Sequence, residues 1–199
     1  MGKVIQGQNL SLDDVDSEKT YEECHFTYSS DQLSFSAVAF KNCTFEQTDF
    51  SHSEWVECEF KSCQFLNNNF SESCFFQTVF NKYQLMGTNF SNNTWKNVTV
   101  KDSKADYCNF SSSKIDASSF VDTSLLEAYF QETKIKKKLL CHNCEMNGVD
   151  FLDTSLRGLD LSTSYFDDLI VTPSLVKGCI IAPLQATAFA GLLGVKFKE

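Results

Sequence analysis

The sequence predicts an all-β solenoid, in which short extended segments wind repeatedly around one narrow hydrophobic core. Three observations lead to this prediction. A large apolar residue recurs at every fifth position, a small residue precedes it by two positions, and the repeat continues through most of the 199 residues. The stretch CTFEQTDFSHSEWVECEFKSCQF, residues 43–65, shows all three features.

A spacing of five residues does not suit either common secondary structure. On an α-helix, steps of five advance by about 140° and would spread the aromatic rings around the whole circumference. In a flat strand, an odd period would send successive rings to opposite faces. A chain that bends once in every pentad can send each central ring into the same tube, so the repeat indicates a coil.

The repeat divides the chain into three segments. Residues 1–34 form an acidic, irregular leader or first coil, because Tyr21 and Phe26 lie in a different frame. Residues 35–181 form the solenoid, with a lapse at Ala105 and a register slip of one residue near 141–145. Its central positions are Phe35, Phe40, Phe45, Phe50, Trp55, Phe60, Phe65, Phe70, Phe75, Phe80, Leu85, Phe90, Trp95, Val100, Phe110, Ile115, Phe120, Leu125, Phe130, Ile135 and Leu140, then Met146, Phe151, Leu156, Leu161, Phe166, Val171, Val176 and Ile181. Residues 182–199 follow the last pentad.

The position two residues before each centre is nearly always Cys, Ser, Thr, Ala or Val. A tube filled by one ring per wall leaves room beside the ring for only a small side chain. We therefore expect distortions of the coil at the exceptions, Asn68, Tyr83, Asn93 and Lys138.

This pattern of a small residue, any residue, a large apolar residue and two polar residues resembles the pentapeptide-repeat family. Members of that family form a right-handed quadrilateral β-helix with four pentads per coil. The resemblance implies that rings twenty residues apart stack on one wall. Phe50, Phe70, Phe90, Phe110 and Phe130 would form one such stack, and Trp55 and Trp95 would share another wall.

Composition favours a cytoplasmic binding protein over an enzyme. The formal net charge is −9, no apolar run is long enough to span a membrane, and the first residues lack the apolar core of a signal peptide. Most of the nine cysteines fall at the small inward position, so we expect buried free thiols and no metal site, even at Cys141 and Cys144 of CHNC. No catalytic or phosphate-binding motif is present, and we expect no catalytic residue and no cofactor.

The outward positions carry an excess of acid, which suggests a binding surface for a basic partner. The alternative is that these acids form an ordinary solvated surface that aids solubility. If the chain dimerises at its C-terminal end, the acids of the last coils flank the centre of the assembly. These candidate binding residues are Glu127, Glu132, Asp150, Asp153, Asp160, Asp167 and Asp168.

The C-terminal segment predicts a short helix from about Pro183 to Leu193, because Pro suits a first helical turn and Gly194 suits a stop. One interpretation is a cap over the open end of the solenoid. The apolar content also suggests that a second copy docks here and forms a two-fold dimer. The candidate dimerisation residues are Leu184, Ala188, Phe189, Leu192 and Leu193.

The stretch LVKGCIIAPLQATAFAGLLGVKF, residues 175–197, resembles the C-terminal segment of the Qnr and MfpA-type quinolone-resistance proteins. The match falls on Gly178, Gln185, Ala186, Leu192, Leu193 and Gly194. The resemblance implies a homodimeric, non-enzymatic DNA mimic that binds DNA gyrase and topoisomerase IV, protects them from fluoroquinolones, and contacts neither nucleic acid nor membrane. A scaffold whose acidic faces bind another intracellular protein is the alternative, and an enzyme is the third.

Overall fold

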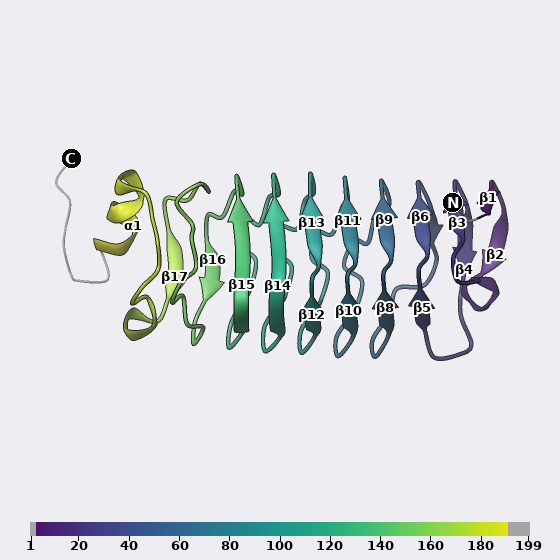
Figure 1. Cartoon of the computed structure of the whole chain (residues 1–199), viewed down its shortest axis with the longest axis horizontal. Helices are drawn as coiled ribbons and strands as arrows, with labels where there is room; N and C mark the ends of the chain where they lie inside the picture. The colour runs from purple at the N-terminus through teal and green to yellow at the C-terminus, as the bar shows by residue number, and fades with distance from the viewer. Residues whose placement is uncertain (1–2, 191–199) are drawn as a thin grey trace.

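The structure is a computed structural model that describes residues 3–190. These residues wind into a straight rod of about eight stacked turns, with the N-terminus at one end and a short helix at the other (Figure 1). The rod is a right-handed quadrilateral β-helix, which confirms the predicted fold class. Every strand pair within it is parallel, because each coil passes a given wall in the same direction.

Each coil has four walls, and each wall is one pentad wide. We number the walls by the columns of central residues that stack along the rod. Wall 1 holds Phe35, Trp55, Phe75, Trp95, Ile115 and Ile135; wall 2 holds Ile5, Tyr21, Phe40, Phe60, Phe80, Val100, Phe120 and Cys141; wall 3 holds Leu10, Phe26, Phe45, Phe65, Leu85, Ala105, Leu125, Met146 and Phe166; wall 4 holds Phe50, Phe70, Phe90, Phe110, Phe130, Phe151 and Val171.

The strands are short, because the chain turns a corner after every pentad. Walls 1 and 2 share a twelve-stranded sheet. On wall 1 lie β5 (Ser34–Ser36), β8 (Glu54–Val56), β10 (Cys74–Phe76) and β12 (Thr94–Lys96); on wall 2 lie β1 (Val4–Gln6), β3 (Thr20–Glu22), β6 (Ala39–Lys41), β9 (Glu59–Lys61), β11 (Val79–Asn81) and β13 (Thr99–Lys101); β14 (Lys114–Val121) and β15 (Lys134–His142) run along both walls. Wall 3 carries β2 (Asn9–Ser11), β4 (His25–Thr27) and β7 (Thr44–Phe45), and wall 4 carries β16 (Val149–Phe151) and β17 (Leu169–Val171).

The core is a continuous pile of rings. The predicted wall 4 stack is confirmed: the ring centroids of Phe50 and Phe70 are 4.7 Å apart and those of Phe90 and Phe110 are 5.4 Å apart, with nearly parallel planes. Trp55 and Trp95 share wall 1, separated by Phe75. Rings on adjacent walls meet edge to face, as Phe90 and Trp95 do at 5.3 Å. Both arrangements are the preferred contacts of aromatic pairs.

The corners restrict the last residue of most pentads. In most of them this residue has a positive φ, for example 58° at Asn92 and 54° at Glu132. β-branched residues strongly resist this left-handed conformation, and none of the positive-φ positions holds Val, Ile or Thr. Asn and Gly adopt it most easily, and Gly148 occupies one such corner with φ of 68°. The repeat is therefore set by the corners as well as by the rings.

The small inward residues confirm the predicted second column and add hydrogen bonds to it. Ser113 donates its hydroxyl to the carbonyl oxygen of Phe90 in the coil before, over 3.0 Å. Its hydroxyl oxygen also accepts the backbone N–H of Asn93, over 3.0 Å. A single small hydroxyl thus bridges two coils, which is why the position selects for size and polarity together.

Three of the four expected exceptions fit inside without breaking the coil. Tyr83 is fully buried, and its ring packs edge to face on Phe60 and Phe80. Asn93 is also buried, and its side-chain oxygen accepts the backbone N–H of Ser73 as a hydroxyl would. Asn68 is buried and donates to the carbonyl oxygen of Gln47. The predicted distortions at these positions were wrong.

The register slip lies earlier than the sequence indicated. β14 and β15 pair in register from Ile115 with Ile135, and the pairing then shifts by one, so that Phe120 lies beside Cys141. The extra residue is therefore in the lysine triplet at 136–138, not at 141–145. Cys141, which is buried, occupies the central position that we had predicted for Leu140, which is only partly buried. The error arose because Leu140 and Cys141 are both apolar, so the sequence did not distinguish the two frames.

The first residues already belong to the solenoid. β1 pairs with β3, and β3 with β6, so Ile5 and Tyr21 continue the wall 2 column below Phe40. Ile5 and Tyr21 are sixteen residues apart, not twenty, because the 3-10 turn Leu12–Asp14 takes the place of part of a wall. Tyr21 and Phe26 fell outside the main frame because the coil that follows them is also short, with nineteen residues from Tyr21 to Phe40 and from Phe26 to Phe45.

The C-terminal end is closed by a short cap. It consists of the 3-10 turn Pro183–Gln185 and the helix α1 (Ala186–Ala190), after a further 3-10 turn at Pro173–Leu175. Gln185 is buried and donates its side-chain N–H groups to the carbonyl oxygens of Leu161 and Ser164, over 3.0 and 2.6 Å. The ring of Phe189 meets Phe166 edge to face at 6.2 Å. The cap therefore satisfies carbonyl groups and covers a ring that the last coil would expose to water.

Candidate functional site: an acidic side of the rod

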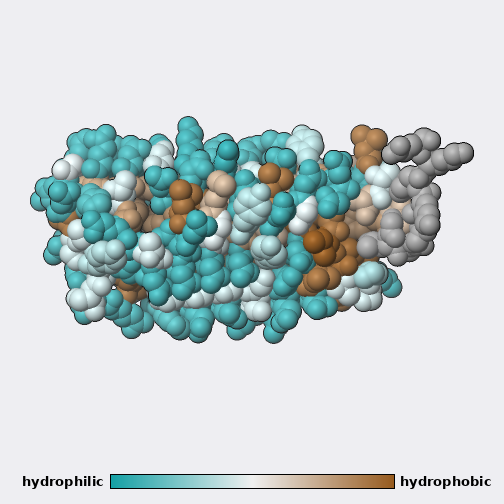
Figure 2. All heavy atoms as spheres, turned by 180° about the vertical axis from the view of Figure 1, so that it is seen from behind, coloured by the Kyte–Doolittle hydropathy of each residue, from teal (hydrophilic) through white to brown (hydrophobic). Residues whose placement is uncertain are grey.

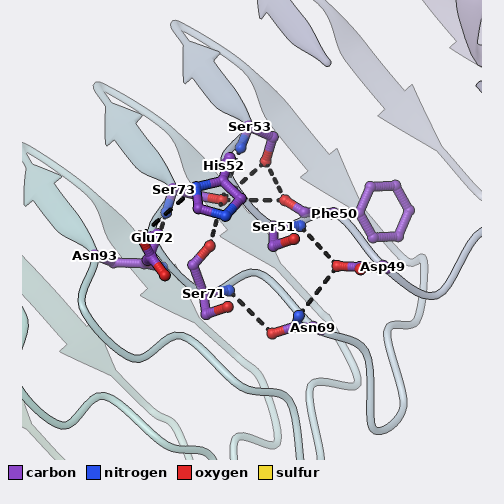
Figure 3. Close-up of polar contacts among 10 residues, drawn as sticks. All are labelled: Asp49, Phe50, Ser51, His52, Ser53, Asn69, Ser71, Glu72, Ser73 and Asn93. Atoms are coloured by element: carbon purple, nitrogen blue, oxygen red, sulfur yellow. Dashed lines mark hydrogen bonds and ion pairs between the residues drawn. The ribbon is translucent and has the colours of Figure 1, made fainter. Parts of the chain in front are cut away.

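The outward surface of wall 4 is built on a repeated Asx turn. Asp49 and Asn69 occupy neighbouring coils, and each accepts, through its side-chain oxygen, the backbone N–H two residues on, at Ser51 and Ser71 (Figure 3). The amide of Asn69 also donates to the Asp49 carboxylate over 3.0 Å. The hydrogen bonds to Ser51 lower the pKa of Asp49 below its ordinary value. This carboxylate is held in place and ionised.

A column of outward residues runs along the corner between wall 4 and wall 1. His52 and Glu72 are the members shown in Figure 3, with 3.7 Å between the His52 ring nitrogen and the Glu72 carboxylate. Glu132 and Asp153 extend the same column into the last coils. The backbone N–H of Glu132 donates to the carbonyl oxygen of Leu152, and both corner residues have positive φ. The two residues are thus equivalent positions on adjacent coils.

Six of the seven predicted acidic binding residues lie on walls 3 and 4. Glu127, Asp167 and Asp168 belong to wall 3 pentads, and all three are exposed. Glu132 and Asp153 are exposed on wall 4. Asp160 does not join them, because its bridges to Leu140 and Ile180 place it on wall 2.

Asp150 lies on wall 4 but is largely buried, with 6% of its surface exposed. Its carboxylate accepts the amide of Gln131 over 2.6 Å and the backbone N–H of Leu152 over 2.8 Å. Its role is therefore mainly to hold the corner that presents Glu132 and Asp153. Asp160 makes the same kind of turn with Ser162, and the hydroxyl and N–H of Ser162 lower its pKa.

The acidic side also carries exposed apolar groups toward the C-terminal end. Figure 2, which views the rod from behind, shows a mainly hydrophilic surface with hydrophobic side chains gathered near that end. A shallow hollow there is lined by Leu126, Glu127, Tyr129, Asn147, Gly148, Asp150, Asp168 and Ile170. Tyr129 and Ile170 remain 42% and 45% exposed. Sequence reasoning did not find this hollow, because its residues come from three coils.

Sequence reasoning also missed the separation of charge around the rod. Between residues 43 and 190, walls 3 and 4 hold most of the acids, with Lys104 as the only lysine or arginine among them: Glu46, Asp49, Glu72, Asp106, Glu127, Glu132, Glu145, Asp150, Asp153, Asp167 and Asp168. Walls 1 and 2 hold the cations Lys41, Lys61, Lys82, Lys96, Lys101, Lys114, Lys134, Lys136, Lys137, Lys138, Arg157 and Lys177, alongside Glu54, Glu57, Glu59, Asp102, Asp116, Asp122 and Asp160. One side of the rod is therefore strongly acidic, although the sequence shows lysines throughout.

The cysteines are free thiols, as predicted, and most of them are buried. Burial raises the pKa of Cys58 and of Cys144 to about 11. Cys141 and Cys144 of CHNC both point into the core, where Cys144 donates to the carbonyl oxygen of Phe120. Between residues 3 and 190, no group of three His, Cys, Asp or Glu side chains is arranged to hold a metal ion. None of the helices in this range has the length and apolar character needed to cross a membrane.

The predicted dimerisation residues do not share one environment. Leu184 is 93% exposed. Ala188 and Phe189 are partly buried and pack against the solenoid core, as parts of the cap. Leu192 and Leu193 lie outside the described residues.

Comparisons with known proteins support the repeat and the fold. Residues 33–110 match a family model described as "Pentapeptide repeat region". No curated protein sequence matches the chain. A solved structure of trypsin-treated QnrB1, a plasmid-mediated fluoroquinolone resistance protein, aligns with a TM-score of 0.50 at 16% identity, over 99% of this chain and 98% of that chain.

Two further solved structures align less closely. Full-length QnrB1 gives a TM-score of 0.41 at 14% identity, over 96% of this chain and 100% of that chain. HetL, a pentapeptide repeat protein involved in heterocyst differentiation regulation from a Nostoc cyanobacterium, gives 0.37 at 10% identity, over 90% and 85%.

The walls, corners and stacked rings define a class of protein, the quadrilateral β-helical solenoid, whose chemistry lies on its outer surface. Within that class, the family model of the pentapeptide repeat region matches residues 33–110, and the structure continues the same pentads through the coils beyond them.

Proposed function

We propose that this chain is a non-enzymatic DNA mimic that binds the type II topoisomerases DNA gyrase and topoisomerase IV in the cytoplasm and protects them from fluoroquinolones. The observation that carries the proposal is the acidic side formed by walls 3 and 4, on which Lys104 is the only lysine or arginine between residues 43 and 190. The likeness of its fold to QnrB1, a fluoroquinolone resistance protein, agrees with it.

The physical basis is the resemblance of a straight acidic rod to a DNA duplex. Duplex DNA presents negative charge at regular intervals, and a basic groove that binds it attracts other rods of similar charge. Coils stack about 4.8 Å apart, so about eight coils give a rod of roughly 40 Å. The corner column between walls 4 and 1 contributes Glu72, Glu132 and Asp153 to this charge, with His52, Asn92 and Ser112 at the equivalent positions of the other coils.

The proposal includes a homodimer formed at the C-terminal end, which would double the length of the acidic side. Leu184 supports it, because this leucine of the cap is 93% exposed and offers apolar surface to a second copy. We expect the unmodified protein to scatter light as a dimer and Leu184→Glu to shift it toward monomers. A monomer for the unmodified protein would contradict the dimer.

A supercoiling assay tests the main proposal. DNA gyrase is inhibited with ciprofloxacin, and the purified protein is added at increasing concentration. Recovery of supercoiling at a fixed drug concentration is the expected result. Inhibition of gyrase without recovery would support a binder that does not protect, and no effect at any concentration would contradict the proposal.

A second candidate is a scaffold whose acidic walls bind another intracellular protein. The hollow around Tyr129 and Ile170 favours it, because exposed apolar groups beside carboxylates are typical of protein interfaces. The same assay separates the two candidates, since a scaffold for another partner would leave gyrase unaffected with and without drug.

A further inference from the structure

The side of the rod opposite the acidic walls carries a dense group of lysines on three neighbouring strands. β12, β14 and β15 lie side by side on wall 1 (Figure 1). Lys114 lies directly beside Lys134, and Lys96 and Lys136 flank Asp116 in the parallel column. With Lys137 and Lys138 these four form what we call the lysine patch: Lys96, Lys114, Lys134, Lys136, Lys137 and Lys138, all exposed.

The lysine patch is poorly neutralised by its own chain. Its one ion pair among the described residues joins Lys137 to Asp116 over 3.5 Å, and the Lys137 side chain is still 72% exposed there. Like charges directly opposite each other on neighbouring strands are unfavourable, and Lys114 and Lys134 are such a pair. Lys41 and Lys61 on wall 2 are such a pair too, so the feature that distinguishes the lysine patch is the number of cations gathered on three neighbouring strands.

The register slip in β15 is a β-bulge, and it adds one lysine to the patch. A regular pentad after Thr133 would end at Lys137, and the next would begin with the buried Leu139. Lys138 is the inserted residue, and it is exposed between these two pentads. The irregularity thus places one more cation on the surface without disturbing the core.

We propose that the lysine patch is a second binding surface, which takes the phosphate backbone of duplex DNA. Several lysines on a flat face two to three strands wide match the closely spaced phosphates of a duplex. The expectation that the chain contacts no nucleic acid came from its resemblance to DNA-mimic proteins. At physiological ionic strength, charges are screened within about 8 Å, so acids across the rod do not cancel the patch locally.

Two other occupants fit the surface less well. A protein that lies on an anionic membrane normally inserts apolar side chains beside its lysines. None of the strongly exposed large apolar residues between 3 and 190 belongs to β12, β14 or β15. The acidic walls of a second copy would also attract the patch, but a contact between different surfaces of identical rods does not close and would build chains of copies.

The test measures anisotropy of a fluorescently labelled DNA duplex with the full chain and no topoisomerase, so its result is independent of the proposed function. We expect binding that weakens steeply between about 50 and 200 mM salt. The patch variant replaces Lys134, Lys136, Lys137 and Lys138 with Gln. The control variant replaces Lys41, Lys61, Lys82 and Lys101 with Gln, which changes the net charge equally but lies on wall 2 and its corner.

The patch variant should lose about tenfold or more in affinity at low salt and show a shallower salt dependence, while the control variant changes about twofold or less. Circular dichroism melting of both variants confirms that they fold. Equal loss in both variants, or no binding by the unmodified protein at low salt, would overturn the proposal. Stronger binding to phosphatidylserine vesicles than to DNA, or light scattering that grows with protein concentration and vanishes in the patch variant, would also overturn it by assigning the patch to lipid or to a second copy.

Discussion

Phe90 illustrates what holds a single residue in this fold. Its ring stacks between Phe70 and Phe110, each 5.4 Å away, and meets Trp95 edge to face. The same atoms therefore join three successive coils and two adjacent walls. The aromatic neighbours of Phe90 are other core rings, so removal of its side chain leaves a void that the flat, stiff strands cannot close.

Phe90→Ala should lower the free energy of unfolding by about 3 to 5 kcal/mol, because it removes a fully buried ring and leaves a cavity. Denaturant titration measures the change. Phe76→Ala is the matched control: Phe76 lies one residue after a central position and is only partly buried, so we expect a clearly smaller loss. Equal losses of stability would contradict the assignment of Phe90 to the core and of Phe76 to the outer side of the coil.

The buried thiols give the stability a predictable dependence on alkaline pH. Burial raises the pKa of Cys58 and Cys144 to about 11, whereas an unfolded thiol titrates near 8.5. Because the folded pKa is the higher one, the unfolded chain releases these protons first. The stabilisation is complete below about pH 8.5 and is lost as the pH rises toward 11.

We therefore expect the urea midpoint to fall between pH 7 and about pH 10. The variant with Cys58→Ala and Cys144→Ala should show a smaller fall over the same range, since lysines and tyrosines are unchanged in it. An identical fall in both proteins would show that other groups control the alkaline transition.

At the scale of elements, the coil that contains β15 does not need the inserted residue Lys138 in order to form. Without Lys138, the pentads Thr133–Lys137 and Leu139–Asn143 would follow each other in the regular frame, and Ile135 and Cys141 would keep their central positions. Removal of Lys138 should leave the protein folded, with a melting temperature equal to or above that of the unmodified protein. Loss of the folded state would show that the bulge is required.

Removal of one residue from a regular coil is the control. Without Lys96, every residue downstream would shift by one place relative to the corners, and central rings would meet water. This variant should not fold beyond that coil, which a loss of the β-sheet signal in circular dichroism would report.

The sequence predicted the coils well because one rule repeats in them, and it predicted the exceptions poorly because each has a local cause. The position of the bulge depended on whether Leu140 or Cys141 was central, and both are apolar. Tyr83 fits the core because rings of the preceding coil leave room for it, a fact that no single pentad contains. The cap role of Gln185 required knowing that the carbonyl groups of Leu161 and Ser164 point at it.

At the scale of the whole molecule, most acids lie on walls 3 and 4 and most lysines on walls 1 and 2. This separation is not visible when the charges are read in order along the chain. A lysine such as Lys134 and an acid such as Glu132 are two residues apart in sequence but lie on opposite sides of a corner. Reading the sequence in steps of twenty could have shown the separation after the insertion was placed correctly. The seven candidate acids were chosen by their distance from the C-terminus, and the fold separates Asp160 from the other six.

The acidic side should account for topoisomerase binding and for its dependence on salt. The test variant neutralises Glu127, Glu132, Asp153, Asp167 and Asp168 to Gln or Asn, and it spares Asp150, whose carboxylate holds Gln131 and Leu152. The control variant neutralises Glu54, Glu57, Glu59, Asp102 and Asp122 on walls 1 and 2, which gives the same change in net charge. Both should keep their stability within about 0.5 kcal/mol per site, because exposed charges contribute little to folding.

Gyrase binding should weaken strongly in the test variant, with a flatter dependence on salt, and change little in the control, because a basic groove reads the local column of charge and not the total. Surface plasmon resonance at several salt concentrations measures both quantities. Equal weakening in the two variants would assign binding to diffuse charge. Undiminished binding in both would exclude DNA mimicry and leave the apolar hollow around Tyr129 and Ile170 as the contact to be tested next.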